Sequence, residues 1–209
     1  MARHAEDTLG MSPVPMPLHL VRWPSGFVYG LCRDGRSSVF RKCRLPMKDI
    51  LIRPVRDSDR KHIVRLMNDF QKYLIHIDTF HCLRRHPHFG SSYIRRMIAR
   101  VKKHGGIIFV AEQRRGIIGF IAGVFQVQSK ADALEYRPMR KARLIELYVA
   151  ARYRGKGVGF QLMKCAEEYF KKHKCDRLEL GVDAFNTAAH DYYLRLGYCD
   201  RNIDMWKDL

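Results

Sequence analysis

The sequence predicts a single α+β domain built on a mixed, mostly antiparallel sheet with helices around it. At 209 residues with 46% hydrophobic side chains, the chain is long enough to bury a substantial core. Its hydrophobic pattern switches between period 2 and period 3.6 in the order strand, two helices, hairpin, strand, helix, strand, helix, strand. The hairpin makes its strands antiparallel, and the later strand–helix–strand succession predicts one parallel crossover.

Residues 1–46 differ from the rest of the chain. They hold five of the eight prolines and seven Lys or Arg against three Asp or Glu. Neither hydrophobic period persists there beyond a few residues. We therefore expect a basic, flexible extension at 1–46 and a folded domain at 47–209.

The first strand and helix are predicted after residue 49. Residues 50–53 have strand character and end at Pro54, which cannot donate to a sheet ladder. Asp57 or Ser58 can cap the helix that follows. The apolar residues of this helix recur at spacings of four, three and four, as expected of one helical face. They are Ile63, Met67, Phe70 and Leu74.

A second helix and a hairpin come next. Ser91 or Ser92 is expected to cap the helix, and the glycine pair at 105–106 to end it. Strands are predicted at 107–112 and 117–125, joined by a short turn.

The second half of the domain continues with a strand at 143–149, a glycine-rich turn and a helix. The expected core face of that helix consists of Val158, Leu162, Cys165, Ala166, Tyr169 and Phe170. Alternating apolar residues then predict a strand at 178–183.

The last helix is expected to begin at a cap formed by Asn186 or Thr187 and to end at Gly197. The residues that follow, 198–206, are predicted to add one more strand.

The glycine-rich turn predicts an anion site. It reads Arg152-Tyr-Arg-Gly-Lys-Gly-Val-Gly159, and its glycines let N–H groups approach a ligand at a helix start, where the helix dipole also favours an anion. A mononucleotide P-loop needs Ser or Thr after Gly-Lys, but Gly157 stands there. A dinucleotide fingerprint needs Gly-x-Gly-x-x-Gly, whereas these glycines are spaced two apart. We therefore expect the turn to bind a pyrophosphate or a similar anion of another ligand.

The net charge of +18 is the strongest feature of the composition. Such a charge is typical of proteins that are attracted to polyanions, nucleic acid above all. The basic residues are spread along the whole chain, however, and no zinc-finger, RNP or helix-turn-helix pattern is present. The sequence therefore allows nucleic acid as a partner without favouring it.

Other features indicate a cytoplasmic protein. No apolar run approaches the roughly 20 residues of a membrane span, and the N-terminus lacks the apolar core of a signal peptide. The six cysteines form no C-x-x-C pair, which favours reduced thiols. The spacing His81-Cys82-x-x-x-His86-x-His88 matches no common zinc pattern, so no metal site is predicted.

Two motifs together resemble a known family. The turn Arg154-x-x-Gly157-x-Gly159, directly after a Leu-Tyr-Val strand, is similar to the acyl-CoA-binding motif of the GCN5-related N-acetyltransferase (GNAT) superfamily. The later segment Asn186-Thr-Ala-Ala189-His-Asp-Tyr192-Tyr193, followed by Gly197-Tyr198, resembles the other hallmark of that superfamily. The resemblance covers roughly residues 48–206 and implies the GNAT fold, whose element order is the one given above.

The resemblance implies acetyl-CoA as acyl donor. Main-chain N–H groups of residues 154–159 would hold its pyrophosphate, and the backbone of Leu147 and Val149 would pair with the pantetheine arm in a gap beside the strand at 178–183. The N–H of Val149 would also polarise the thioester carbonyl. Asn186 would touch the arm, although capping its own helix explains this residue equally well. The implied cofactor contacts are Leu147, Tyr148, Val149, Arg152, Arg154, Gly155, Lys156, Gly157, Val158, Gly159, Asn186 and Tyr193.

The resemblance also suggests two catalytic residues. Tyr193 matches the acid that meets the departing thiolate; its alternative role is a core tyrosine. Glu146 lies in an otherwise apolar strand, where a carboxylate is costly unless it is paired or used. We expect it to act as base or amine-binding carboxylate, the alternative being a structural ion pair with Arg143 or another nearby cation. Strand alternation places Glu146 on the same face as Leu144 and Tyr148.

On the acceptor side, the resemblance implies that Tyr73, Phe80 and the histidine-rich loop shape a substrate pocket together with Glu146; the alternative is a plain surface loop. The expected activity is an N-acetyltransferase, an acetyl-CoA-dependent N-acyltransferase that moves the acetyl group directly to a primary amine of a small molecule or a protein. Two alternatives from other classes are a non-catalytic acyl-CoA-binding sensor and a basic nucleic-acid-associated protein. The sequence leaves the acceptor and a homodimeric state open.

Overall fold

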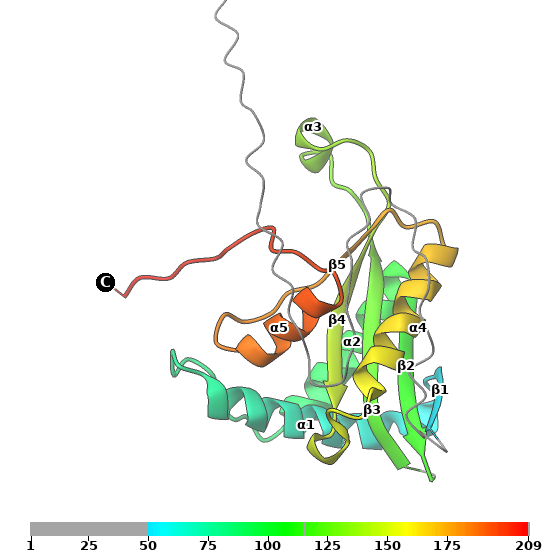
Figure 1. Ribbon diagram of the computed structural model, residues 1–209, viewed down its shortest axis with the longest axis vertical. Coiled ribbons are helices and arrows are strands. Elements are labelled where there is room, and N and C mark those ends of the chain that lie inside the picture. The colour runs from blue at the N-terminus through cyan, green and yellow to red at the C-terminus, as the bar shows by residue number, and fades with distance from the viewer. Residues whose placement is uncertain (1–49, 115, 209) are drawn as a thin grey trace, which may run out of the picture. The chain divides into compact units, whose positions relative to one another are not determined.

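A computed structural model describes residues 50–114 and 116–208, and the proposed extension at 1–46 lies outside them. Within the described residues the sheet has five strands in the order β1-β2-β3-β4-β5. The first four strands pair antiparallel, and β4 pairs parallel with β5. This is the mixed, mostly antiparallel α+β sheet that the sequence predicts (Figure 1).

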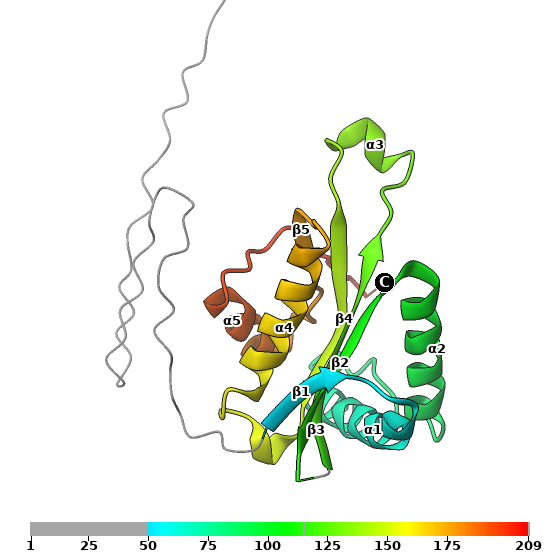
Figure 2. The same cartoon turned by 90° about the vertical axis from the view of Figure 1, so that its right-hand side faces the viewer.

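Helices cover both faces of the sheet (Figure 2). Helices α1 (Arg60–Ile77) and α2 (Phe89–His104) pack on one face, where Ile63 and Ile94 join a buried cluster with Phe120. Helix α4 (Val158–Lys172) packs on the other face, where Leu162 and Phe170 form a second buried cluster with strand residues. None of the helices in the described part of the chain is both long and apolar enough to cross a membrane.

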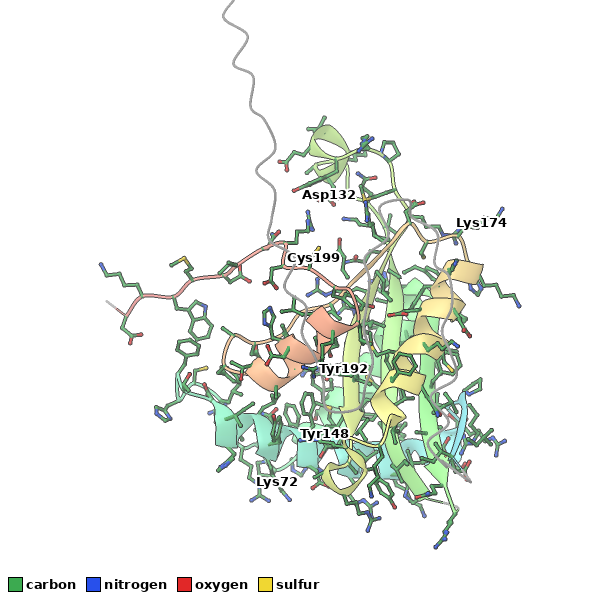
Figure 3. All side chains as sticks on the ribbon, in the orientation of Figure 1. Lys72, Asp132, Tyr148, Lys174, Tyr192 and Cys199 are labelled. Carbon is green, nitrogen blue, oxygen red and sulfur yellow. The ribbon has the colours of Figure 1, made fainter. Side chains whose placement is uncertain are left out.

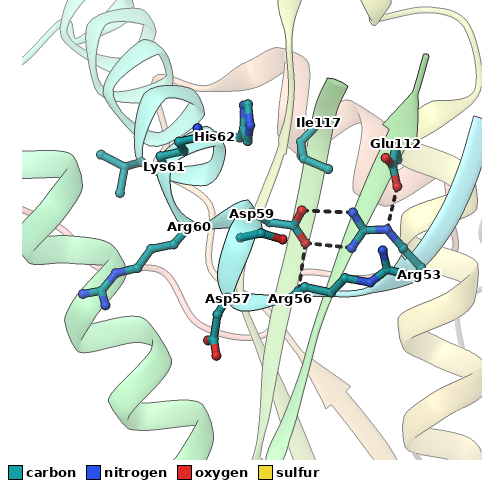
Figure 4. Close-up of a pocket in the computed structure, with 11 residues that line it drawn as sticks. Arg53, Arg56, Asp57, Asp59, Arg60, Lys61, His62, Glu112 and Ile117 are labelled. Atoms are coloured by element: carbon teal, nitrogen blue, oxygen red, sulfur yellow. Dashed lines mark hydrogen bonds and ion pairs between the residues drawn. The ribbon is translucent and has the colours of Figure 1, made fainter. Parts of the chain in front are cut away.

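A buried ion-pair network holds the first strand to the first helix. Strand β1 (Ile50–Pro54) carries Arg53, which donates to both carboxylate oxygens of Asp59 at 2.7 and 2.9 Å and to Glu112 of β2 at 2.6 Å (Figure 4). The expected cap at Asp57 or Ser58 is wrong in detail. These residues belong to a short 3₁₀ helix (η1, Asp57–Asp59) without a side-chain cap hydrogen bond, and α1 begins only at Arg60.

Helix α2 begins at Phe89, two residues before the predicted caps Ser91 and Ser92. A contact with another helix explains this earlier start. Asn68 of α1 accepts a hydrogen bond from the N–H of Gly90 at 2.9 Å and so satisfies a donor of the first turn from another helix. A Cβ at Gly90 would lie 2.7 Å from the carbonyl oxygen of Val64, so only glycine allows this close approach. The helix ends at His104, before Gly105, as predicted.

The hairpin forms where it is predicted, from β2 (Gly106–Gln113) and β3 (Gly116–Gln126). A short helix α3 (Asp132–Glu135) follows, and β4 (Lys141–Val149) then returns beside β3. After β4 come a 3₁₀ turn (η2, Ala151–Tyr153) and the predicted helix α4.

A bulge in β4 corrects the expectation that Glu146 shares a face with Leu144. Ala122 pairs with Glu146, but the next residue, Gly123, pairs with Leu144. Ile145 is therefore an extra residue on β4, and such a residue shifts the side-chain alternation. As a result Leu144 belongs to the cluster under α4, whereas Ile145 and Tyr148 pack on the α1 and α2 side.

The C-terminal part departs most from the prediction. Strand β5 (Arg177–Glu179) has three residues rather than six, and helix α5 (Thr187–Arg195) follows it. The predicted strand at 198–206 is wrong, because those residues form no ladder. Side chains hold this segment instead: His190 lies 2.7 Å from Asp200, and Arg201 lies 3.5 Å from Glu179.

We predict that Asp59→Asn lowers the free energy of unfolding by about 3 kcal/mol, because it leaves the buried Arg53 guanidinium short of a charged partner. The hydrogen bond from Arg53 lowers the pKa of Asp59 below its ordinary value. The stabilisation is therefore fully present above about pH 4, the unfolded pKa, and is lost as the pH falls through the lower folded pKa. Urea unfolding between neutral and acidic pH measures this.

The matched control is Asp57→Asn, since Asp57 is exposed and belongs to the same turn. It should leave the unfolding free energy within about 0.5 kcal/mol of the wild type. Equal effects of the two substitutions would contradict the role of the network.

Candidate functional site

The site begins where β4 and β5 separate. Their parallel pairing comprises three residue pairs and stops at Arg143 with Glu179, although β4 continues to Val149. Residues 144–149 thus have β3 on one side and no strand on the other. This leaves a free edge of β4 inside the sheet.

The backbone of Leu147 and Val149 faces that free edge. The carbonyl of Tyr148 points toward β3, where it lies 2.9 Å from the position of a Cβ on Gly119, and the N–H of Ala150 donates to Ile118 of β3 at 2.9 Å. Because backbone groups alternate along a strand, those of Leu147 and Val149 point the opposite way. An extended ligand can therefore pair with them.

The free edge leads into the glycine turn and the start of α4. Gly155 and Gly157 have φ of +71° and +78°, a conformation that side chains rarely adopt, and neither has an atom near the position of a Cβ. Gly157 stands at the N-cap of α4. The first helical turn therefore leaves the N–H groups of Val158 and Gly159 without intrahelical acceptors, next to an open backbone that a phosphate can approach.

The basic residues of the turn take two different positions. Arg152 and Lys156 are exposed and lie over the ring of Tyr153, at 4.9 and 5.8 Å from its centroid. Both can reach an anion at the turn.

Arg154 instead folds back onto the domain. Its Nε donates to the carbonyl of Val149 at 3.0 Å, and its guanidinium lies 4.5 Å from the ring centroid of Tyr73 and 5.4 Å from that of Tyr148. Its N–H already donates to Ala151 at 3.1 Å. Arg154 therefore orders the turn in this structure, with Tyr73 beneath its side chain and Tyr148 buried beside Phe70.

A buried hydroxyl also lies at this turn. The hydroxyl oxygen of Tyr192 has no hydrogen-bond partner among the described residues and lies 3.2 Å from the position of a Cβ on Gly159. Figure 3 shows Tyr192 on α5 beside α4. A buried donor without an acceptor is costly, so a ligand acceptor at this place fits. The sequence analysis missed Tyr192, and its position beside the family-matched Tyr193 is the only signal that pointed to it.

Glu146 has a partner that the sequence analysis also missed. The hydroxyl of Tyr93, on α2, donates to the carboxylate of Glu146, so the alternative ion pair with Arg143 is not the contact observed. Burial raises the pKa of Glu146 to about 7; the Tyr93 hydrogen bond opposes this rise, and the negative charge of Asp183 adds to it. The carboxylate can therefore take up and release a proton near neutral pH.

Tyr193 lies on α5 and packs against the same cluster as Leu147 and Val149, and Asn186 is the N-cap residue of that helix. Burial raises the pKa of Tyr193 to about 12, and the nearby charge of Glu146 contributes, which places the two groups within electrostatic reach of each other. Asn186 is buried at the N-cap of α5, but its side chain makes no cap hydrogen bond. The capping role considered for Asn186 is therefore not realised in this structure.

The loop after α1 brings an aromatic group, Phe80, to the segment that precedes α5. Phe80 is 56% exposed, and its ring centroid lies 6.1 Å from that of Phe185 and 5.6 Å from that of Trp206. Asp78 organises this loop, since it accepts hydrogen bonds from the N–H groups of Phe80 and Leu83 at 2.9 and 2.7 Å. Among the described residues, no three His, Cys, Asp or Glu side chains gather in a way that can hold a metal.

Solved structures share this architecture. A mutant protein from Bacillus halodurans superposes with a TM-score of 0.66 at 20% identity, over 76% of this chain and 99% of that one. An aminoglycoside N-acetyltransferase in complex with CoA gives a TM-score of 0.60 at 14% identity, over 78% and 98% of the two chains. At such identities the likeness defines the class of fold, that of the acetyltransferases.

The family follows from the sequence itself. The family model described as Acetyltransferase (GNAT) family matches residues 65–198, more than half of the chain. The chain therefore belongs to the GNAT family. An uncharacterised N-acetyltransferase of Methanocaldococcus jannaschii is 32% identical over 95 residues, which are 46% of this chain and 40% of that protein. The chain spans about half the length of the curated relatives it matches.

We predict that Gly157→Ala weakens acetyl-CoA binding by about tenfold, because a left-handed backbone costs a residue with a Cβ about 1–2 kcal/mol and the turn must rearrange. Isothermal titration calorimetry measures the change. Gly116→Ala is the matched control, since a Cβ there meets its nearest atom at an ordinary 3.5 Å, and it should leave the Kd unchanged. A Kd for Gly157→Ala equal to that of the wild type would show that the turn does not hold the ligand.

Proposed function

We propose that this protein is an N-acetyltransferase that moves the acetyl group of acetyl-CoA directly to a primary amine. One observation carries the proposal: the unpaired edge of β4 leads from a partly buried carboxylate, Glu146, straight into an anion-binding helix start. Family membership and the fold shared with a CoA-bound acetyltransferase support it.

The residues at the free edge fit the donor. The N–H groups of Val158 and Gly159 and the charges of Arg152 and Lys156 suit the pyrophosphate and the 3′-phosphate. The edge of Leu147 and Val149 suits the amide-bearing pantetheine arm. The unpartnered hydroxyl of Tyr192 is a further donor at the same place, and a bound acceptor would remove the cost of its burial. Bound there, acetyl-CoA supplies an activated thioester.

Glu146 is the proposed base. An amine is mostly protonated at neutral pH and must lose a proton before it attacks. With a pKa near 7, Glu146 is partly ionised at neutral pH and accepts that proton directly or through water. Asp183 adds negative charge near it, which favours a cationic amine in the same place.

Tyr193 is the proposed acid. With a pKa of about 12 its phenol stays protonated at neutral pH, so it can give a proton to the departing thiolate. The N–H of Val149 points to the same edge and can stabilise negative charge on the carbonyl oxygen. Tyr73 lies under Arg154, next to the cofactor turn, and Phe80 lies beside the segment that precedes α5, where we place the acceptor.

Two measurements test the proposal in sequence. Calorimetry with acetyl-CoA asks whether the donor binds; release of free CoA with a panel of polyamines, aminoglycosides and peptide N-termini asks whether it reacts. Binding with amine-dependent CoA release supports the enzyme. Binding without turnover on any amine would favour a non-catalytic acyl-CoA sensor. No binding would contradict both the enzyme and the sensor.

We predict that Glu146→Gln lowers kcat/KM by about 100-fold or more, as expected when a general base is lost.

In the wild type, activity should rise with pH through about pH 7, because Glu146 must be deprotonated to act. Tyr93→Phe removes a hydrogen bond that lowers this pKa, so the rising limb should move to higher pH. The pH dependence of kcat/KM measures it, because kcat/KM reports the pKa values of the free enzyme, and a limb that stays in place in Tyr93→Phe would contradict the role of Tyr93.

We predict that Tyr193→Phe lowers kcat by about 100-fold while the Kd for acetyl-CoA stays within about twofold. The neighbouring Tyr192→Phe should show the opposite pattern, with weaker acetyl-CoA binding and a nearly unchanged kcat, since its hydroxyl lies at the start of α4. Steady-state kinetics and calorimetry on both variants provide the comparison. Equal losses of kcat in the two variants would contradict the assignment of Tyr193 as the acid and of Tyr192 as a residue that only binds the ligand.

A further inference from the structure

The outer face of α2 is a continuous row of positive charge. The helix contains five Lys or Arg residues and no Asp or Glu, and all five are exposed: Arg95, Arg96, Arg100, Lys102 and Lys103. At 100° per residue they fall within an arc of about 160°, and between Arg95 and Lys103 only the small Ala99 shares that arc. The opposite face of the helix, with Ile94 and Met97, is buried in the core.

None of these five cations forms an ion pair within residues 50–114 and 116–208. Like charges three and four residues apart destabilise a helix, so the arrangement carries a cost that a bound polyanion would offset. Helix α4 provides the contrast. It mixes three lysines with Glu167 and Glu168, and its Lys164 lies 3.7 Å from Glu168.

A second group of exposed cations lies at the start of α1, near which the first turn of α2 packs. Gly90, in the first turn of α2, lies against Val64 and Asn68 of α1. Around that end of α1 is the hollow of Figure 4, in which Arg60 extends toward the neighbouring helix. The exposed cations of this part are Arg56, Arg60, Lys61 and Arg65. Three acids line the hollow, and two of them, Asp59 and Glu112, are already bound to Arg53. The exposed Asp57 therefore offsets one of these positive charges.

The shape and chemistry of this surface select among polyanions. No large exposed apolar side chain of the described residues lies on α1 or α2, so the surface lacks the apolar face that inserts into a membrane. It also presents no exposed aromatic platform on which unpaired bases stack. With 16 residues α2 is about 24 Å long. A helix of this length can lie along the major groove of B-form DNA, whereas the narrow groove of A-form RNA does not admit one.

We propose that the outer face of α2, extended by the start of α1, binds the phosphate backbone of duplex DNA. The contact is electrostatic and independent of base sequence. The cations are on the exposed side of α2, whereas Tyr93 of the same helix faces Glu146, and the proposal does not depend on the acyl transfer proposed above.

The test uses the full chain and a fluorescein-labelled duplex DNA, with anisotropy measured from about 0.05 to 0.3 M salt. The wild type should bind with a Kd of about 1–100 µM near physiological salt. The triple variant Arg95→Gln/Lys102→Gln/Lys103→Gln should bind at least about tenfold more weakly. Its slope of log K against log salt should be shallower by about one unit for each phosphate that the variant no longer neutralises. Arg96 and Arg100 are left in place because they lie near Tyr93.

The matched control is Lys164→Gln/Lys171→Gln/Lys172→Gln, which removes the same charge from α4. It should retain wild-type affinity and slope. Circular dichroism and acetyl-CoA calorimetry on both triple variants establish that each is folded. Equal weakening of DNA binding in the control would show that only the net charge of the protein matters, and it would overturn the proposal. Tighter binding of duplex RNA, of single-stranded DNA or of poly-glutamate would overturn duplex DNA as the partner.

Discussion

Strand β4 pairs with β5 for only three residues, and the geometry of the candidate site depends on this short pairing. The closed end is held firmly: the N–H of Arg140 donates to the Asp176 carboxylate at 2.7 Å, and Lys141 lies 3.4 Å from Glu179. Beyond Arg143 the strands diverge, and the guanidinium of Arg143 lies 3.1 Å from the position of a Cβ on Gly181. The gap is thus closed at one end by charges. At the other end the main chain of β4 is paired with no strand, and the Val149 carbonyl accepts from the side chain of Arg154. Unpaired backbone groups inside a sheet are costly unless a ligand or water satisfies them.

The bulge at Ile145 decides which side of the sheet carries the carboxylate. Without the extra residue, Glu146 would keep the alternation of Leu144 and point into the largely apolar cluster under α4, away from Tyr93, where burial of its charge is costly. With the bulge it lies on the α2 side, where Tyr93 donates to it. One irregular residue therefore converts a destabilising carboxylate into one with a hydrogen bond and a pKa near 7. Bulges commonly have this effect next to active sites, where they redirect a side chain.

The features that the sequence predicted are those that depend on local sequence patterns. Periodicity predicted the hairpin, β4 and α4, and the spacing of the glycines predicted the turn before α4. What it could not predict arises between distant segments. The first turn of α2 is satisfied by Asn68, 22 residues before Gly90, and the partner of Glu146 lies 53 residues away from it. The strand expected at 198–206 is wrong for a related reason: a strand needs a neighbouring edge to pair with, and the local sequence does not show whether one is present.

Helix α2 contributes to the proposed acyl-transfer site through Tyr93 and to the proposed DNA-binding surface through its exposed cations. Arg96 lies 5.8 Å from the ring centroid of Tyr93, and the charges of Arg96 and Arg100 partly offset the rise in the pKa of Tyr93 that burial and Glu146 cause. The main influences on the pKa of Tyr93 do not include Arg95, Lys102 and Lys103. Exposed charges are screened within about 8–10 Å at physiological salt, so a polyanion held by these three residues would change the field at Glu146 little. A polyanion that also engaged Arg96 and Arg100 would weaken the offset they provide and make Tyr93 a poorer donor to Glu146. Whether the partner contacts Arg96 and Arg100 therefore determines whether its binding and the protonation of Glu146 are independent or coupled.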